Sequence, residues 1–197
     1  MQKMPILNFK TGRQCLYLFF GFILNTYFIT SASSAIAELY EKVQIDSNGQ
    51  LHIVTTDNRE ILPSKRELQS GDKIEKQVNF EQAAVSDDKT TVGWLAQYPN
   101  CCTSYPIPLE LVIYRNGKTL RVFKGSELPI WIWKFEAKGA QVAFKQETVH
   151  GGGGVHFELR EIISDRLVGS YNDEPTPNAP AWVRDLTPKI IIQPEGE

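Results

Sequence analysis

The sequence predicts a mainly β protein built from consecutive antiparallel hairpins. Short runs rich in valine, isoleucine and aromatic residues recur along the chain, and polar turn residues separate them. Two of these turns are Asn-Gly pairs, at Asn48-Gly49 and Asn116-Gly117. Both residue types tolerate the positive φ that hairpin turns often require. Apolar residues at helical spacing are scarce, so we expect strands to form the core.

The first 37 residues contain the three parts of a secretory signal peptide in the order that export requires. A basic start without acidic residues precedes an apolar run over residues 15–29, and small residues then lead to Ala37. The apolar run is shorter than the roughly 20 residues that a membrane-spanning helix needs. We expect cleavage near Ala37/Glu38, a periplasmic or secreted protein, and no membrane insertion after cleavage. An uncleaved membrane anchor is the alternative.

The elements that follow the signal peptide can be placed in order. A hairpin is expected over residues 43–54, and Ser64 with Glu67 has the spacing of a capping box, which predicts a helix that Gly71 limits to about two turns. Further strands are expected at residues 84–94 (as a hairpin), 111–114, 119–123, 130–135, 141–144, 155–159 and 166–171. A Pro-rich linker, a short helix over 180–186 and a tail occupy residues 173–197.

Two segments of the chain resemble each other at a spacing of fifty residues. Residues 84–94 and 134–144 each read as strand, tight polar turn and strand, and a second hairpin follows each of them. Four strands per repeat of about 40–50 residues is the pattern of a propeller blade. We therefore divide a β-rich domain over residues 38–172 into two blade-like repeats, at 80–123 and 130–172.

The repeats resemble those of the TolB-type β-propeller, which run strand, Ser-Pro-Asp-Gly turn, strand and outer hairpin. The two turns read Ser-Asp-Asp-Lys at residues 86–89 and Glu-Ala-Lys-Gly at residues 136–139, so both lack the proline and only the second has the glycine. The resemblance covers about residues 80–172. It implies a binding platform without catalytic residues. Closed propellers need about four blades, so an open or partial propeller, closure through a homo-oligomer, and a compact sandwich all stay open.

Composition and motifs narrow the classes of partner. The net charge is −2, and residues 1–37 contribute only basic side chains, so the exported part is mildly acidic. Nucleic-acid binding needs clustered lysine and arginine, which the sequence lacks. It also lacks the Rossmann, P-loop, His-Glu-x-x-His and paired Cys-x-x-Cys motifs, so no cofactor is expected. An unknown protein or a small ligand, for example a carbohydrate, remains as partner.

The first candidate binding feature is the loop around Cys101 and Cys102, which are the only cysteines after residue 37. Cα atoms of adjacent residues lie about 3.8 Å apart, whereas ordinary disulfides prefer about 4.4–6.8 Å, so a bridge between them would be strained. Three interpretations stay open: two small residues buried under the loop, a structural vicinal disulfide, and a ligand platform or redox switch. Tyr98 and Tyr105 flank the pair and could stack against a sugar ring.

The second candidate is a tetraglycine loop bounded by His150 and His156. With Glu147 these histidines could hold a metal, since imidazole and carboxylate suit zinc. The simpler interpretation makes them neighbours across a flexible hairpin turn. A Ser-His-Asp hydrolase is disfavoured because a Gly-x-Ser-x-Gly elbow is missing. If the repeats align, both candidate loops join the second and third strands of their repeats, which places them on the same side of the molecule.

The aromatic residues Trp131, Trp133 and Phe135 are expected on one strand face, as core rather than as a sugar platform. The predicted core comprises Val85, Val92, Trp94, Leu111, Ile113, Trp133, Phe135, Val142, Phe144, Phe157 and Leu159. Taken together, these observations favour a non-enzymatic, exported binding or interaction module of the cell envelope. The alternative is an exported hydrolase or metal-dependent enzyme that uses the loop of His150 and His156.

Overall fold

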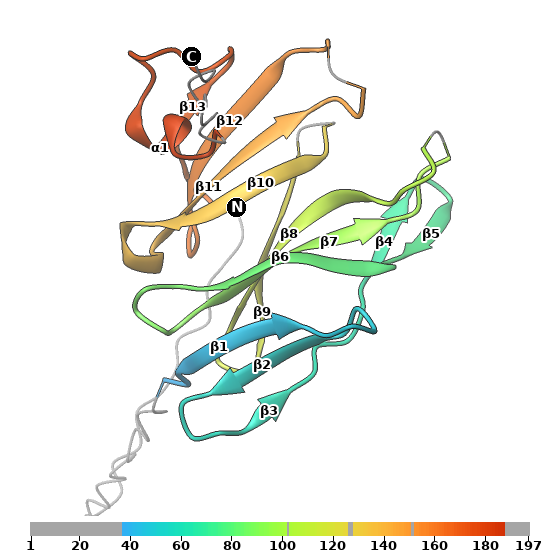
Figure 1. The fold of residues 1–197 in the computed structure, drawn as a ribbon, viewed down its shortest axis with the longest axis vertical. Coiled ribbons are helices and arrows are strands. Elements are labelled where there is room, and N and C mark those ends of the chain that lie inside the picture. The colour runs from blue at the N-terminus through green and yellow to red at the C-terminus, as the bar shows by residue number, and fades with distance from the viewer. Residues whose placement is uncertain (1–36, 102, 126–127, 151, 188–197) are drawn as a thin grey trace, which may run out of the picture. The chain divides into compact units, whose positions relative to one another are not determined.

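The computed structural model describes residues 37–101, 103–125, 128–150 and 152–187. All but the last residue of the predicted signal peptide, 1–37, therefore lies outside the described residues. The predicted fold class is confirmed, because the described chain is mainly β and its strands form four antiparallel sheets (Figure 1). Within these ranges the structure has no helix that is both long enough and apolar enough to cross a membrane.

The first sheet has three strands, β1 (Tyr40–Ile45), β2 (Leu51–Thr55) and β3 (Glu60–Ile61), in that spatial order. The predicted hairpin turn joins β1 to β2, with Gly49 in the left-handed region at φ 74°. Alternate residues of β2 are buried, as expected for a strand with one face on the core. This sheet is the first layer of the fold.

A short hairpin replaces the helix that was predicted from Ser64. The segment forms β4 (Glu67–Ser70) and β5 (Lys73–Lys76), which pair antiparallel. Gly71 adopts φ 59° in the tight turn between them, where a helix would have required a negative φ. Because Leu68 is buried in the core while its neighbours are exposed, alternation and not helical spacing governs this segment. The helix prediction was wrong.

The second layer is a four-stranded meander. It contains β6 (Asn79–Val85), β7 (Val92–Tyr98), β8 (Ile107–Arg115) and β9 (Lys118–Lys124), each paired with the next. The predicted Asn116-Gly117 turn joins β8 to β9 with φ values of 51° and 73°. Two consecutive positive φ values match the mirror-image turn that suits a two-residue hairpin.

The third layer repeats this arrangement with β10 (Ile130–Glu136), β11 (Gln141–Glu147), β12 (Val155–Glu161) and β13 (Leu167–Tyr171). A 3₁₀-type turn at Ala137–Gly139 joins its first two strands. After β13 the chain reaches the predicted short helix, α1, which spans Ala181–Arg184 and has Pro180 at its N-cap.

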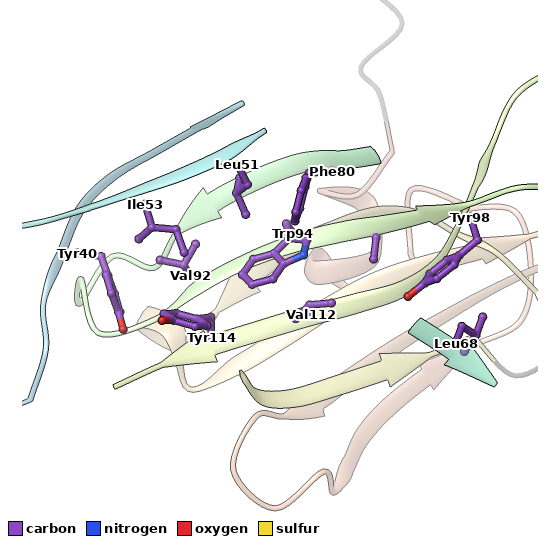
Figure 2. Close-up of a cluster of buried hydrophobic side chains, with 11 residues drawn as sticks. Tyr40, Leu51, Ile53, Leu68, Phe80, Val92, Trp94, Tyr98, Val112 and Tyr114 are labelled. Carbon is purple, nitrogen blue, oxygen red and sulfur yellow. The ribbon is translucent and has the colours of Figure 1, made fainter. Parts of the chain in front are cut away.

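Three clusters of buried side chains hold these layers together. The first, between the β1–β3 sheet and the β6–β9 sheet (Figure 2), contains Tyr40, Leu51, Ile53, Leu68, Phe80, Val92, Trp94, Ala96, Tyr98, Val112 and Tyr114. The second, between the two four-stranded sheets, contains Leu95, Leu111, Ile113, Phe123, Ile130, Trp133, Val142, Phe144 and Ile162. The third, under the C-terminal segment, contains Ala143, Val155, Phe157, Leu159, Ala179, Val183 and Leu186.

The fifty-residue spacing relates positions that face the same way. Val92 and Trp94 on β7 lie in the first cluster, between their sheet and the β1–β3 sheet. Val142 and Phe144 on β11 lie in the second cluster, between their sheet and the β6–β9 sheet. In each four-stranded sheet the strands lie side by side in chain order, and the first strand does not pair with the last. The sheets are therefore open and stack as layers instead of closing into a barrel. Consecutive blade-like sheets are therefore the architecture of the described chain.

The predicted core is largely confirmed. Val85 and Phe135 are half-buried, and the other predicted core residues are buried. The predicted aromatic face needs correction at Trp131, which belongs to none of the three clusters. The β10–β11 register shifts between Ile130 and Ile132, so this bulge breaks the alternation that would have aligned Trp131 with Trp133.

Candidate binding site

The two predicted binding loops lie at the same end of the four-stranded sheets (Figure 1). The β6–β7 and β10–β11 turns touch at the opposite end, where a Cβ placed on Gly139 would lie 2.6 Å from the Cβ of Ser86. The β7–β8 and β11–β12 loops leave the far ends of the same strands, and they therefore share one end. We call this the loop end, and the opposite end the turn end.

Tyr98 belongs to the core and not to the loop surface. Its side chain is fully buried, and its hydroxyl donates to Oε2 of Glu110 over 2.7 Å. Nε of Arg66 donates to the same oxygen over 2.8 Å. Burial, followed by the neighbouring Glu110 carboxylate, raises the pKa of Tyr98. The predicted stacking of the Tyr98 ring against a sugar is therefore wrong, because the ring is fully buried in the core.

The rest of the cysteine loop is at the surface. Cys101 and Tyr105 are exposed, so the structure does not place Cys101 under the loop as one interpretation required. Cys102 lies outside the described residues, and the vicinal disulfide therefore stays a prediction. A hydrogen bond between Nδ2 of Asn100 and Oγ1 of Thr103, at 3.0 Å, ties the loop across its tip.

The histidines of the tetraglycine loop have different surroundings. His150 is exposed, whereas His156 is half-buried on β12 and hydrogen-bonds Asn172 and Glu158, with 3.0 Å between its Nε2 and Oε1 of Glu158. Among the described residues, no group of three histidine, cysteine or acidic side chains is placed to hold a metal ion. Among the described residues, the side chains that hydrogen-bond His156 therefore form a structural network.

Glu158 is the centre of that network. It is buried on β12, and Nε of Arg160 donates to it. Burial alone would raise the pKa of Glu158, but hydrogen bonds from Arg160 and His156 outweigh this effect and lower it. The carboxylate is thus held in its charged form inside the sheet stack. A buried ion pair of this kind is strongly destabilising to break.

The turn end contains a hollow of about 570 Å³ between the two four-stranded sheets. It is lined by residues of four segments that are distant in sequence, namely Asp88, Arg115, Ala137, Lys138, Gly139, Ala140, Gln141, Glu161, Ile162 and Ile163. We call it the turn-end hollow. Its size falls within the range of about 300–1,000 Å³ that is usual for ligand pockets. The wall combines both signs of charge with two isoleucines.

Backbone strain is concentrated in the wall of this hollow. Ala137 and Lys138 have φ values of 48° and 55°, and Gly139 follows at 92°. A non-glycine residue in the left-handed region is held there at a cost on the order of 1–3 kcal/mol. Lys89, fifty residues before Gly139, is also left-handed at φ 58°. The fourth residue of each repeat turn therefore has a positive φ.

The charges of the hollow are set by local hydrogen bonds. Burial would raise the pKa of Asp88, but hydrogen bonds from Ser86 and Thr90 lower it overall. Nη2 of Arg115 lies 3.7 Å from Oδ2 of Asp88. Lys138 projects from the strained turn and is exposed. The hollow thus presents a fixed carboxylate beside cationic groups.

Three exposed apolar residues, which we call the exposed apolar strip, lie in the β12–β13 turn and at the start of β13. Ile163, in the β12–β13 turn, lines the hollow and remains 60% exposed, and Leu167 and Val168 on β13 are exposed as well. Strand β13 pairs only with β12 among the described strands, so its other edge has no strand partner in that part of the chain. An edge strand with exposed apolar side chains is a ready template for pairing.

The turn-end hollow was not predicted from the sequence, although one sequence feature lies in its wall. The aligned turns at residues 86–89 and 136–139 were identified as a repeat, and both contribute to its wall. Arg115 and Ile163 could not be assigned to the hollow, because only the stacking of the sheets brings them to the turns. The predicted loops at the other end contribute no residue to this wall.

Comparison with known proteins adds no family. No protein-family model matches the chain, and no curated protein is significantly similar to it. The geometry of the turn-end hollow and of β13 is therefore the starting point for function.

Proposed function

We propose that this chain is an exported binding module of the cell envelope, which recognises a segment of a partner protein at the turn-end hollow and along β13. The proposal rests mainly on Ile163, which lines the turn-end hollow and is also the first residue of the exposed apolar strip. Export follows from the signal-like character of residues 1–37.

The chemistry of the surface favours a polypeptide as partner. A peptide carries charges of both signs, apolar side chains and backbone hydrogen-bonding groups, and the surface offers a complement to each. Asp88 and Lys138 can pair with opposite charges, whereas Ile163, Leu167 and Val168 can bury apolar side chains. The open edge of β13 can take an added strand, because backbone groups there face away from β12.

The blade-like architecture supports the same function. Rigid sheets that present turns and loops at their ends are typical scaffolds for binding residues. The resemblance of residues 80–172 to TolB-type repeats also points to a platform for interaction and brings no catalytic residue with it. A mainly binding function therefore agrees with both the surface and the repeats.

Site-specific photo-crosslinking in the host organism tests the proposal. A photo-reactive amino acid at Ile163 should give a discrete adduct of higher mass, because it lies within the proposed contact. The matched control is Ile74, which is 61% exposed against 60% for Ile163 but lies on β5, away from the hollow. Similar adducts from both positions, or none from Ile163, would contradict the proposal.

A charge substitution gives a second measurement on the same adduct. Lys138→Glu reverses an exposed charge in the hollow and should strongly reduce crosslinking from Ile163, whereas Lys42→Glu, on the exposed part of β1, should leave it unchanged. N-terminal sequencing of the exported protein tests its location, with a start near Glu38 expected. A full-length chain in the membrane fraction would refute export of a cleaved form.

A further inference from the structure

His52 lies between two carboxylates on the first sheet. It is on the face of β2 that points away from the core, since its neighbours Leu51 and Ile53 are buried. Its Nδ1 lies 2.8 Å from Oε1 of Glu60 on β3, and its Nε2 lies 3.2 Å from Oδ2 of Asp46, which directly follows β1. Each ring nitrogen therefore faces a carboxylate oxygen, and the contacts join all parts of this sheet.

Only the protonated ring can satisfy both contacts. An ionised carboxylate accepts hydrogen bonds but cannot donate one, and a neutral imidazole has a single N–H. The imidazolium has two N–H groups and a positive charge, so it can donate to both carboxylates at once. Hydrogen bonds to Glu60, and then to Asp46, raise the pKa of His52 above its ordinary value. The arrangement is thus complete only when His52 carries its proton.

Asp46 extends this arrangement to the chain that follows β3. Its other oxygen, Oδ1, accepts the backbone N–H of Gln50 over 2.8 Å. This hydrogen bond is the main reason why the pKa of Asp46 lies below its usual range, so the carboxylate stays charged. Nε2 of Gln50 in turn donates to the carbonyl of Pro63 over 3.3 Å. A continuous series of contacts therefore runs from His52 to Pro63.

Pro63 belongs to a segment that covers a second hollow. Residues 61–66, which we call the strap, run from the end of β3 to the start of β4. Together with Trp94, Tyr114 and Thr119 they line a space of about 430 Å³. This space shares no lining residue with the turn-end hollow.

The two ends of the strap are held by different kinds of contact. At its far end, the guanidinium of Arg66 pairs with the buried carboxylate of Glu110 over 2.8 Å. At its beginning, the strap follows directly from Glu60, which is exposed and contacts His52. The beginning of the strap therefore depends on a group that gains or loses its charge between about pH 5 and 8, as histidine does.

The other side chains that face His52 do not cancel this effect. Its partner in the register of β1 is the uncharged Gln44, and Lys42 lies on the same face, two residues away along β1. The cation of Lys42 disfavours a second positive charge nearby. The carboxylates of Asp46 and Glu60 are in direct contact with the ring, and the pKa of His52 is raised overall.

We propose that His52 is a pH-dependent clasp, which fastens β3 and the strap to the first sheet when it is protonated and loosens them over the hollow when it is not. Ion pairs at the surface are individually weak, so the loss of the proton should open the strap locally and leave the rest of the protein folded. The contribution of His52 is present below its ordinary pKa of 6.5 and is lost as the pH rises through the raised folded-state pKa. The clasp is independent of the proposed protein-binding surface.

A nuclear magnetic resonance titration of the purified protein tests the state of the ring. Nitrogen spectra of the three histidines follow each ring separately, and His52→Gln identifies the signals of His52. Its pKa should lie above 6.5. Glu60→Gln should lower that pKa, whereas Glu67→Gln, which removes an exposed carboxylate on β4, should not. A pKa at or below 6.5, or equal effects of the two variants, would overturn the proposal.

Hydrogen exchange shows whether the strap responds to the ring. As the pH rises through the pKa of His52, backbone N–H groups of residues 60–66 should become several-fold less protected, after correction for the intrinsic effect of pH on exchange. Those of β11, in the third layer, should keep their protection. In His52→Gln the protection of the strap should no longer depend on pH. Equal protection on both sides of the pKa, or a pH dependence that persists in His52→Gln, would refute the clasp.

Discussion

Trp94 and Phe144 occupy equivalent positions fifty residues apart, and each ring points from the second strand of its sheet into the layer that precedes it. This relationship sets the direction in which the sheets are stacked. It also identifies the side chains on which the contact between layers depends most.

Replacing Phe144 by alanine should destabilise the protein by about 3–5 kcal/mol, because the ring is fully buried between the two four-stranded sheets and leaves a cavity there. Denaturant unfolding of the two proteins measures the difference. Tyr105→Ala, at an exposed position, should change stability by less than about 0.5 kcal/mol. Equal effects of the two substitutions would show that the core has been misassigned.

Gly93→Ala should destabilise the protein by about 1–3 kcal/mol, as expected for overpacking. A methyl group at Gly93 would collide with the six-membered ring of Trp133 in the facing sheet. Trp133→Phe removes the atoms involved, so the double variant should lose less stability than the two single losses added together. Strict additivity would show that these residues do not meet.

Glu158→Gln should lower stability at pH 7 by about 1–3 kcal/mol, because Arg160 and His156 lose their charged partner. The pKa of Glu158 lies below its ordinary value of 4.5, so the contribution of its carboxylate is present above pH 4.5 and is lost as the pH falls through the folded-state pKa. The difference between wild type and variant should therefore shrink in acid. Glu174→Gln, at an exposed position, serves as control and should show no such trend. A difference that grows in acid would contradict the assignment.

Truncation after Asn172 should destabilise the protein strongly, since it removes Val183 and Leu186 from the third cluster. Each fully buried side chain of this kind contributes roughly 1.5–3 kcal/mol. The truncated protein should also bind a dye specific for apolar surface, because Phe157 and Leu159 lose their cover. Asn178→Ala, at an exposed position of the same segment, is the control and should preserve the unfolding midpoint. Equal midpoints for the truncation and this variant would rule out a structural role of the C-terminal segment.

Much of the fold could be predicted because local signals and the global arrangement agree. The Asn-Gly turns fix two hairpins by their backbone preference alone, and the repeat spacing identifies equivalent strands before any contact is known. The β4–β5 hairpin was missed because a single pair, Ser64 and Glu67, matched a helix cap. Its two strands are short and polar, so their sequence carries little periodicity.

The sites were harder to predict, since they depend on contacts between distant segments. Residues 61–66 line a hollow together with Trp94, Tyr114 and Thr119 only because this segment packs over the sheet that carries those three residues. The burial of Tyr98 depends on Glu110, which sits on the neighbouring strand and accepts its hydroxyl. A bulge near Trp131 changes which way a side chain points without a clear sequence signature. Strand assignment alone does not contain such information.

The C-terminal cover of the last sheet has a consequence for assembly. The stack of sheets has a direction, because its first and last faces differ. If a second molecule extended the stack, the two molecules would meet head to tail. Such contacts form either closed rings or open fibres. Ala179, Val183 and Leu186 occupy the face on which a further sheet would dock. The segment therefore covers the face through which such association would begin, and its loss should favour contacts between molecules.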